Sequence, residues 1–272
     1  MGFAEAENVR IEYRWAEGHY DRLPALATDL VRRQVLVIAA GGSAAALAAK
    51  AVSRDVPTVF AVATDPVALG LVEGLARPGH NVTGVTTLGS EIAPKQLELL
   101  HEMLRTASTF ALIINPTNPA MAETVTKNLT AGARTLGMQL RVLQASTERD
   151  FDAVFADLAQ NRASALVIGN DLFFNTRLEQ LAALTVRHAL PAIHEYREFA
   201  MVGGLMSYGT DVTDLYRRVG VYTGRILKGE RPADLPVQQA ENVELVINLK
   251  TAKMLGLTFP TTLLGRADEV IE

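Results

Sequence analysis

The feature that most constrains this fold is an alternation of short apolar runs with amphipathic helical stretches. Six runs rich in β-branched residues are predicted as strands, at residues 9–16, 35–40, 58–63, 110–115, 140–145 and 165–170. Between them lie helical patterns such as residues 19–33, whose apolar stripe consists of Leu23, Leu26, Ala27, Leu30 and Val31. This alternation is typical of βαβ units and a parallel sheet, and strands that are almost entirely apolar predict helices on both faces. We therefore expect an α/β protein.

Composition narrows the classes of function. With 272 residues, of which 49% are hydrophobic, the chain is long enough for two lobes. A net charge of -4 without a long basic run gives no electrostatic basis for binding nucleic acid or an anionic membrane surface. The absence of cysteine excludes disulfides, thiolate nucleophiles and cysteine metal sites. No stretch approaches the roughly 20 apolar residues that span a bilayer, and the N-terminus lacks the basic and apolar regions of a signal peptide.

The βαβ rhythm restarts near residue 106. A helical pattern at residues 94–104 ends there, and a new strand pattern begins at residue 110. We predict a lobe boundary at this point, with residues 1–106 in the first lobe and residues 107–207 in the second.

The first informative strand end is the turn that follows residues 35–40. Gly41, Gly42 and Ser43 lead into an alanine-rich helical stretch, which sets backbone N–H groups and a hydroxyl at a helix N-terminus. Such an end favours an anion, and a small carboxylate suits it. The alternative is that Ser43 caps its own helix and the glycines only permit a tight turn. Neither GxGxxG nor GxxxxGK[ST] occurs, so no motif supports a nucleotide.

Two other strand ends carry a carboxylate. Asp65 precedes Pro66, a pairing that favours a helix N-cap over a ligand contact. Asp171 precedes Phe173 and Phe174, and we interpret it as a partner for a ligand ammonium with a phenyl ring packing the ligand side chain. The alternative is that these rings belong to the core. Further polar or aromatic strand ends are Asn115, His194, Glu195, Tyr196, Ser207 and Tyr208.

Catalytic patterns are weak in this sequence. The five histidines have no metal-ligand spacing, HExxH and GxSxG do not occur, and no spacing demands that Asp65 pair with Glu195 or Asp171 as glycosidase carboxylates. From these residues we expect no metal and no cofactor, whereas serine or glycosidase chemistry stays open without a motif behind it. That the chain is not an enzyme is an expectation that comes only from the family resemblance given next.

Several longer segments carry a family resemblance in combination. They are VRIEYRWAEGHYDRLPALATDLV, AVATDPVALGLVEGLARPGHNVTGVT, IINPTNPA, GGLMSYGTDVTDLYRRVGVYTGRILKGERPADLPV and ENVELVINLKTAKMLGLTFP. The chain resembles the ABC-transporter substrate-binding family that includes tryptophan- and tyrosine-binding lipoproteins. The resemblance implies a type I periplasmic-binding-protein fold, with two Rossmann-like lobes joined by three crossings and a small ligand in the cleft. It also implies that a helix at about 208–230 returns to the first lobe and that residues 231–272 go back to the second.

The resemblance also assigns ligand-binding roles by position. The glycine-serine turn is similar to the family turn that receives a ligand carboxylate, and Asp171 is our choice for the ligand ammonium. The full set of implied ligand-binding residues is Gly42, Ser43, Ala44, Asp65, Thr86, Asn115, Asp171, Phe173, Glu195, Tyr196 and Tyr208.

The N-terminus departs from the family pattern. Family members begin with a signal peptide, followed by a strand and a helix ahead of the segment that matches the start of this chain. In a sheet ordered 2-1-3-4-5, that strand would lie between the runs that begin at Val9 and Val35. We therefore expect a first lobe that lacks its first strand and helix, with a gap or with those two runs forced together. We expect an incomplete chain or a misplaced start, and a periplasmic parent protein.

The function that these observations favour is that of the solute-binding component of an ABC importer. Its ligand would be an amino acid, either aromatic or branched, or another small organic carboxylate, and its partner would be a membrane permease. The alternative is a ligand-sensing regulatory module of the same fold without transport.

Overall fold

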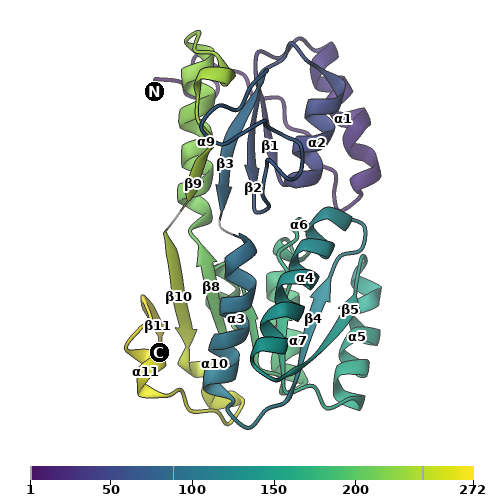
Figure 1. Cartoon of the computed structure of the whole chain (residues 1–272), viewed down its shortest axis with the longest axis vertical. Coiled ribbons are helices and arrows are strands. Elements are labelled where there is room, and N and C mark those ends of the chain that lie inside the picture. Colours follow the sequence, from purple (N-terminus) through teal and green to yellow (C-terminus); the bar gives the residue numbers. More distant parts are fainter. Residues whose placement is uncertain (1, 88, 241) are drawn as a thin grey trace. The chain divides into compact units, whose positions relative to one another are not determined.

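The computed structural model describes residues 2–87, 89–240 and 242–272. The chain folds into two α/β units, each with its own sheet (Figure 1). Unit 1 comprises Met1–Leu88 and Val212–Glu241, and unit 2 comprises Gly89–Asp211 and Asn242–Glu272. The α/β architecture predicted from the alternation of strands and helices is confirmed.

Unit 1 contains a four-stranded parallel sheet in the order β1-β2-β3-β9. Its strands are β1 (Ile38–Gly41), β2 (Thr58–Val62), β3 (Val82–Thr87) and β9 (Gln238–Ala240). Its helices are η1 (Tyr20–Arg22), α1 (Leu23–Arg32), α2 (Ser43–Val52), α9 (Val212–Leu227) and η2 (Pro232–Asp234). Helices cover both faces of this sheet, as strand β2 illustrates. Phe60 and Val62 lie in the core with α2, whereas Val59 and Ala61 lie in the core with α9.

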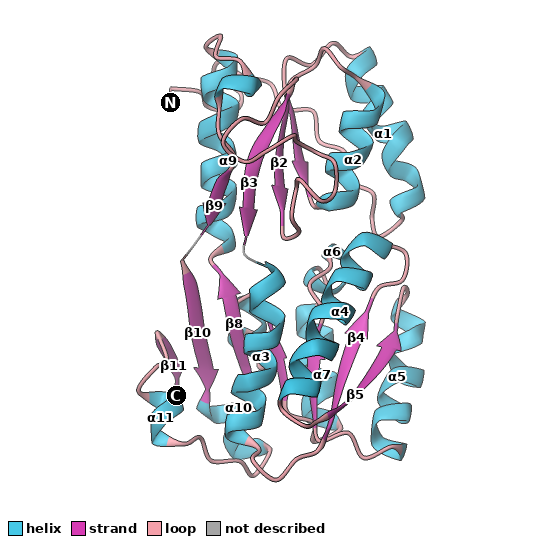
Figure 2. Cartoon of the chain, viewed as in Figure 1, coloured by secondary structure: helices cyan, strands magenta, loops and turns pink. Residues whose placement is uncertain are grey.

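Unit 2 contains a seven-stranded sheet in the order β11-β10-β8-β7-β6-β4-β5 (Figure 2). Its strands are β4 (Thr109–Ile114), β5 (Gln139–Gln144), β6 (Ala165–Ile168), β7 (Ala192–His194), β8 (Met206–Thr210), β10 (Val243–Asn248) and β11 (Glu269–Ile271). Its helices are α3 (Gly89–Met103), α4 (Pro119–Thr135), α5 (Glu148–Gln160), α6 (Leu172–Asn175), α7 (Leu178–Arg187), α8 (Glu198–Met201), α10 (Leu249–Met254) and α11 (Thr261–Leu264). All pairs are parallel except β8 with β10, which is antiparallel.

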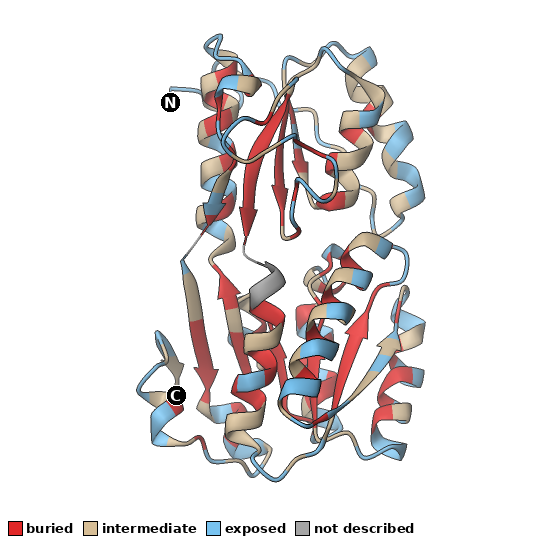
Figure 3. Cartoon of the chain, viewed as in Figure 1, coloured by how far each residue is buried: buried red, intermediate tan, exposed pale blue. Residues whose placement is uncertain are grey.

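The central strands are the most buried elements, as Figure 3 shows for β2, β3 and β4. Every residue of β2, β3 and β6 is buried. For β2 and β6 this agrees with the prediction that strands covered on both faces read as nearly continuous apolar runs, whereas β3 buries three threonines among its six residues. The edge strand β5 has no fully buried residue.

The predicted lobe boundary at residue 106 is wrong. Helix α3 precedes that position, yet it packs against α4 and against β6, β7 and β8 of unit 2. Near its end, Glu102 accepts hydrogen bonds from Thr262 and Arg266 of the same unit. The chain therefore leaves unit 1 between residues 88 and 89, before this helix.

The later crossings also differ from the expected positions. The chain returns to unit 1 at Val212, where helix α9 begins, and not at about residue 208 as expected from the family resemblance. Residues 231–240 remain in unit 1 because β9 pairs with β3, so the tail crosses to unit 2 at residue 242 and not at residue 231.

The predicted strand at residues 9–16 is also wrong. Only an isolated bridge between Glu5 and Val9 forms, and β1 pairs with β2 as its one partner strand in the described part of the chain. The runs that begin at Val9 and Val35 are therefore not forced together.

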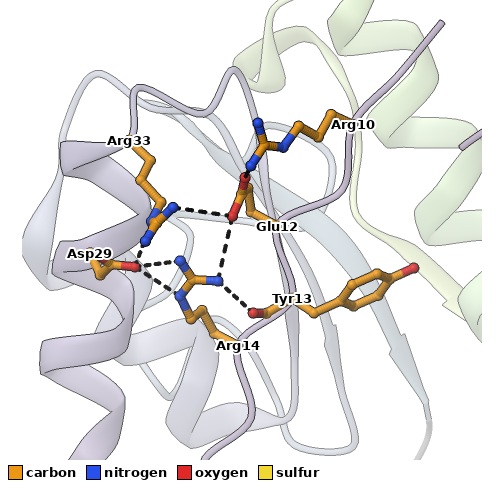
Figure 4. A network of polar contacts seen from close by, with 6 residues as sticks. All are labelled: Arg10, Glu12, Tyr13, Arg14, Asp29 and Arg33. Atoms are coloured by element: carbon orange, nitrogen blue, oxygen red, sulfur yellow. Dashed lines mark hydrogen bonds and ion pairs between the residues drawn. The ribbon is translucent and has the colours of Figure 1, made fainter. Parts of the chain in front are cut away.

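An ion-pair network on α1 holds this N-terminal segment instead (Figure 4). Arg14 donates from Nε and Nη2 to Asp29 Oδ2 at 2.8 and 2.5 Å, and Arg33 donates to the same oxygen at 2.9 Å. The outward side chains Tyr13 and Trp15 stack on each other, with ring centroids 5.9 Å apart. The alternating polar side chains of this segment thus face helix α1, where Arg14 pairs with Asp29. An alternating pattern does not by itself provide the neighbouring strand that a β-strand needs.

Candidate functional site

The glycine-serine turn of unit 1 connects β1 to α2. Gly42 occupies the N-cap position with φ 90°, a left-handed conformation that glycine adopts without strain. The N–H of Gly42 donates to the carbonyl of Ala61 in β2 at 2.8 Å, so this N–H group is already used in strand pairing. The amides of Ser43 and Ala44 lie in the first turn of α2, where a helix offers them no internal acceptor.

Ser43 does not cap α2. It is the first helical residue, buried at 3% exposure, and its Oγ lies 2.8 Å from Thr64 Oγ1. Thr86 at the end of β3 donates to the carbonyl of Thr64 at 3.0 Å. Three hydroxyl residues from successive strand ends therefore meet beside the start of α2, and we call Ser43, Thr64 and Thr86 the hydroxyl cluster.

Tyr216 of α9 covers the same turn, which the sequence did not predict. A Cβ added at Gly41 would lie 2.8 Å from the Tyr216 hydroxyl, so the first glycine permits this close approach. Burial raises the pKa of Tyr216, and its hydroxyl remains protonated at neutral pH. No local signal identifies this tyrosine, because its partner lies on a strand in the other sequence segment of unit 1.

Asp65 caps a turn, and the expected helix after Pro66 does not form. The Asp65 carboxylate accepts from the N–H groups of Val67 at 2.8 Å and Ala68 at 3.3 Å. Residues 66–70 form turns, and the Asp65 side chain is exposed.

In unit 2, Asp171 joins three segments. It is the N-cap of α6, and its Oδ1 accepts from Phe173 N at 3.0 Å. Asn115 Nδ2 also donates to Oδ1, at 2.8 Å, and Asn118 Nδ2 donates to Oδ2 at 2.9 Å. The carboxylate is buried at 4% exposure, and both oxygens are already acceptors within the protein.

Phe173 and Phe174 belong to the core of unit 2. They are 3% and 0% exposed and pack against Phe151, with centroid distances of 5.6 and 6.3 Å. The structure therefore agrees with the alternative that these rings belong to the core, because α6 turns both of them inward against α5.

Glu195 is the other buried carboxyl group at this end of the unit 2 sheet. Its Oε2 accepts from Asn170 Nδ2 at 2.6 Å, whereas its buried Oε1 has no hydrogen-bond partner in the described part of the chain. Burial raises the pKa of Glu195 to about 7. A Cβ at Gly209 of β8 would lie 2.3 Å from Glu195 Cγ, so the carboxyl stem lies directly on the backbone of that strand.

The residues next to Glu195 provide no cation. His194 is fully buried, its Nδ1 accepts from Tyr196 N at 3.0 Å, and burial lowers the pKa of this imidazole to about 3. The ring is therefore neutral, with its proton on Nε2. Tyr196 is partly buried edge-on to His194, and Tyr208 is partly buried with its carbonyl accepting from Gln96 Nε2 at 2.9 Å.

The carboxyl end of the unit 1 sheet and that of the unit 2 sheet favour ligand groups of opposite charge. The hydroxyl cluster and the first-turn amides of α2 in unit 1 offer hydrogen-bond donors at the positive end of a helix, which favours an anion. Glu195 in unit 2 offers an acceptor that suits a cation. Within the described ranges, no group of three or more metal-ligating side chains lies together, and no helix has the length and apolar character to cross a membrane.

Comparisons with known proteins agree with this architecture. A family described as ABC transporter substrate binding protein matches residues 1–271. A tyrosine-binding protein of Clostridioides difficile is 24% identical over 256 residues, which cover 94% of this chain and 73% of that protein.

Solved structures extend the similarity. A conserved domain protein of Vibrio cholerae superposes with a TM-score of 0.91 at 27% identity, covering 99% of this chain and 90% of that one. An ABC domain from Streptococcus pneumonia in complex with L-Trp has a TM-score of 0.87 at 24% identity, covering 97% and 90% of the two chains. A leucine-binding protein of Thermotoga maritima, with a TM-score of 0.54 at 15% identity over 80% of this chain and 64% of its own, shares the type I periplasmic-binding-protein fold.

Proposed function

Because this chain belongs to the family of ABC transporter substrate-binding proteins, we propose that it binds an amino acid and delivers it to the membrane permease of an importer. Among its relatives, one is described as tyrosine-binding and one was solved with L-Trp. These names favour an aromatic amino acid over a branched one or another small carboxylate. We propose the periplasm as the location of the protein.

The observation that carries the proposal is Glu195 Oε1, for which the described ranges of the chain contain no hydrogen-bond partner. A buried carboxyl oxygen without a donor is costly, since a lost buried hydrogen bond is worth about 1–3 kcal/mol. A ligand ammonium supplies both the missing donor and a compensating charge. Asp171 has no such need, because three protein groups already donate to it. We therefore propose Glu195, and not Asp171, as the acceptor for the ligand ammonium.

For the ligand carboxylate we propose the turn of unit 1. Ser43 and Thr86 hold hydroxyls there, and the first-turn amides of α2 add the partial positive charge of the helix. Among the other predicted ligand residues, Gly42 and Ala44 shape this turn. Asp65, Asn115, Phe173, Tyr196 and Tyr208 remain predicted ligand residues, although the contacts described above also give Asp65, Asn115 and Phe173 structural roles.

Titration calorimetry and thermal-shift assays with L-tryptophan and L-tyrosine test the proposal. Their deaminated counterparts, indolepropionate and hydroxyphenylpropionate, serve as matched ligands without the ammonium. A ligand at 100 times its Kd should stabilise the protein by about 2.7 kcal/mol. If neither amino acids nor small carboxylates bind, the proposed function is wrong.

Two isosteric variants decide which acid binds the ammonium. Glu195→Gln should weaken binding of the amino acid about 10- to 100-fold and leave the deaminated ligand nearly unaffected, because a charge-assisted hydrogen bond contributes about 1.5–3 kcal/mol. If Asp171→Asn shows that selective loss and Glu195→Gln does not, the original prediction for Asp171 holds. Uptake of labelled amino acid in a strain that lacks the gene tests the transport role.

A further inference from the structure

We propose that Glu195 carries a proton when no ligand is bound and gives it up to solvent when a ligand ammonium binds, so that the site exchanges one proton for one cationic group. The inference rests on the proposed function and adds the regulation of that same site. The O–H bond of the carboxylic acid ionises, the proton goes to water or buffer, and an N–H···O hydrogen bond to the ammonium forms in its place.

The contacts of Asn170 locate the proton on one oxygen. Asn175 Nδ2 donates to Asn170 Oδ1 at 3.1 Å, which fixes the amide of Asn170 with its NH2 group toward Glu195. That NH2 group donates to Glu195 Oε2, so Oε2 is an acceptor in both protonation states. A proton on Glu195 must therefore reside on Oε1, the buried oxygen that has no hydrogen-bond partner among the described residues.

The surroundings of Glu195 favour the neutral acid. An ionised carboxylate at 5% exposure with a single neutral donor is poorly solvated. The basic side chains within two residues of it in sequence do not compensate it: His194 is neutral, and Arg197 is paired with Glu244 and Glu269. This desolvation raises the pKa of Glu195 to about 7, opposed only by the hydrogen bond from Asn170.

Helix α3, which packs against β7 and β8, carries two basic side chains. Lys95 is paired with Glu98 at 2.6 Å, and the His101 ring packs edge-on to Phe110 of β4. The titratable groups at the neighbouring strand ends in the described part of the chain are acids and phenols, which bring no positive charge; they are Asp171 after β6, Tyr196 after β7, and Tyr208 and Asp211 on and after β8. The ammonium of the ligand is thus the cation that ionises Glu195.

The exchange makes ligand affinity depend on pH in a defined direction. With a pKa of about 7 in the free protein, Glu195 is roughly 90% protonated at pH 6 and 10% at pH 8, so binding releases about 0.9 and 0.1 protons respectively. Affinity for an amino acid should fall about 30-fold between pH 8 and pH 5.5. Affinity for the deaminated ligand should not fall in this way.

Calorimetry in phosphate and imidazole buffers measures the released protons directly, because both bases take up protons between pH 6 and pH 8 and differ in ionisation enthalpy. With L-tryptophan or L-tyrosine at pH 6, the apparent enthalpy should differ between buffers, and the difference should vanish at pH 8 and in Glu195→Gln. Glu179→Gln, which removes an exposed carboxylate from α7 of the same unit, should behave as the wild type. Buffer-independent binding at both pH values would overturn the exchange and leave the proposed function intact.

A second measurement needs neither a ligand nor a folded variant. A carbon-13 NMR titration of the glutamate carboxyl groups in the free wild-type protein should show one resonance with a midpoint near 7. If every glutamate titrates near its ordinary value, the inference fails whatever the ligand proves to be.

Discussion

Asp171→Ala is the sharpest test of the role that the structure gives this carboxylate. The substitution removes the acceptor of three donors, namely Phe173 N, Asn115 Nδ2 and Asn118 Nδ2. Each buried donor left without a partner costs about 1–3 kcal/mol, and partial relaxation lowers the total. We expect the free energy of unfolding to fall by about 3–5 kcal/mol.

Urea denaturation followed by circular dichroism measures this loss, and thermal unfolding should show a decrease in Tm of roughly 6–20 °C. The matched control is Asp65→Ala, in which an exposed carboxylate also accepts from two backbone N–H groups. Water replaces those contacts, so this variant should lose only about 0.5–1 kcal/mol. A loss below 1 kcal/mol for Asp171→Ala, together with abolished binding of amino acids, would refute the structural role and restore Asp171 as the ligand group.

Individual contacts give four further predictions. Gly209→Ala should push Glu195 from its position, because the new Cβ would lie 2.3 Å from its Cγ, and calorimetry should show weakened binding of an amino acid. Gly42→Ala should cost about 1–2 kcal/mol in urea denaturation, because alanine is strained at φ 90°. Without ligand, the free energy of unfolding of the wild type should fall by about 2–3 kcal/mol relative to that of Glu195→Gln as the pH rises from 5 to 8. The reason is that the folded-state pKa of Glu195, about 7, lies above the ordinary value of 4.5, so its contribution to stability is present at low pH and is lost as the pH rises through 7. The pH dependence is opposite for His194, whose folded-state pKa of about 3 lies below the ordinary value of 6.5. In urea denaturation, the free energy of unfolding of the wild type relative to that of His194→Gln should decrease as the pH falls below 6.5.

Some features of the fold follow from local sequence. Strands β2, β4 and β6 lie within one or two residues of their predicted ends, because strands buried on both faces must be apolar throughout. The same reasoning fails for residues 9–16, where the alternation is real but Arg14 on its polar side pairs with Asp29 of α1. A strand needs a neighbouring backbone, and periodicity carries no information about that neighbour.

The sequence by itself determined the α/β class, the turn at Gly42 and Ser43, and the set of polar residues at the strand ends, because all three depend on residues close together in the chain. Only the tertiary structure decided which of those polar residues have unmet hydrogen-bonding needs. Asp171 is satisfied by Asn115 and Asn118, which lie 56 and 53 residues away in sequence, whereas one buried oxygen of Glu195 has no donor within residues 2–87, 89–240 and 242–272. Desolvation and hydrogen-bond partners depend on the packing of distant segments, and for that reason the preferred acceptor for the ligand moved from one acid to the other.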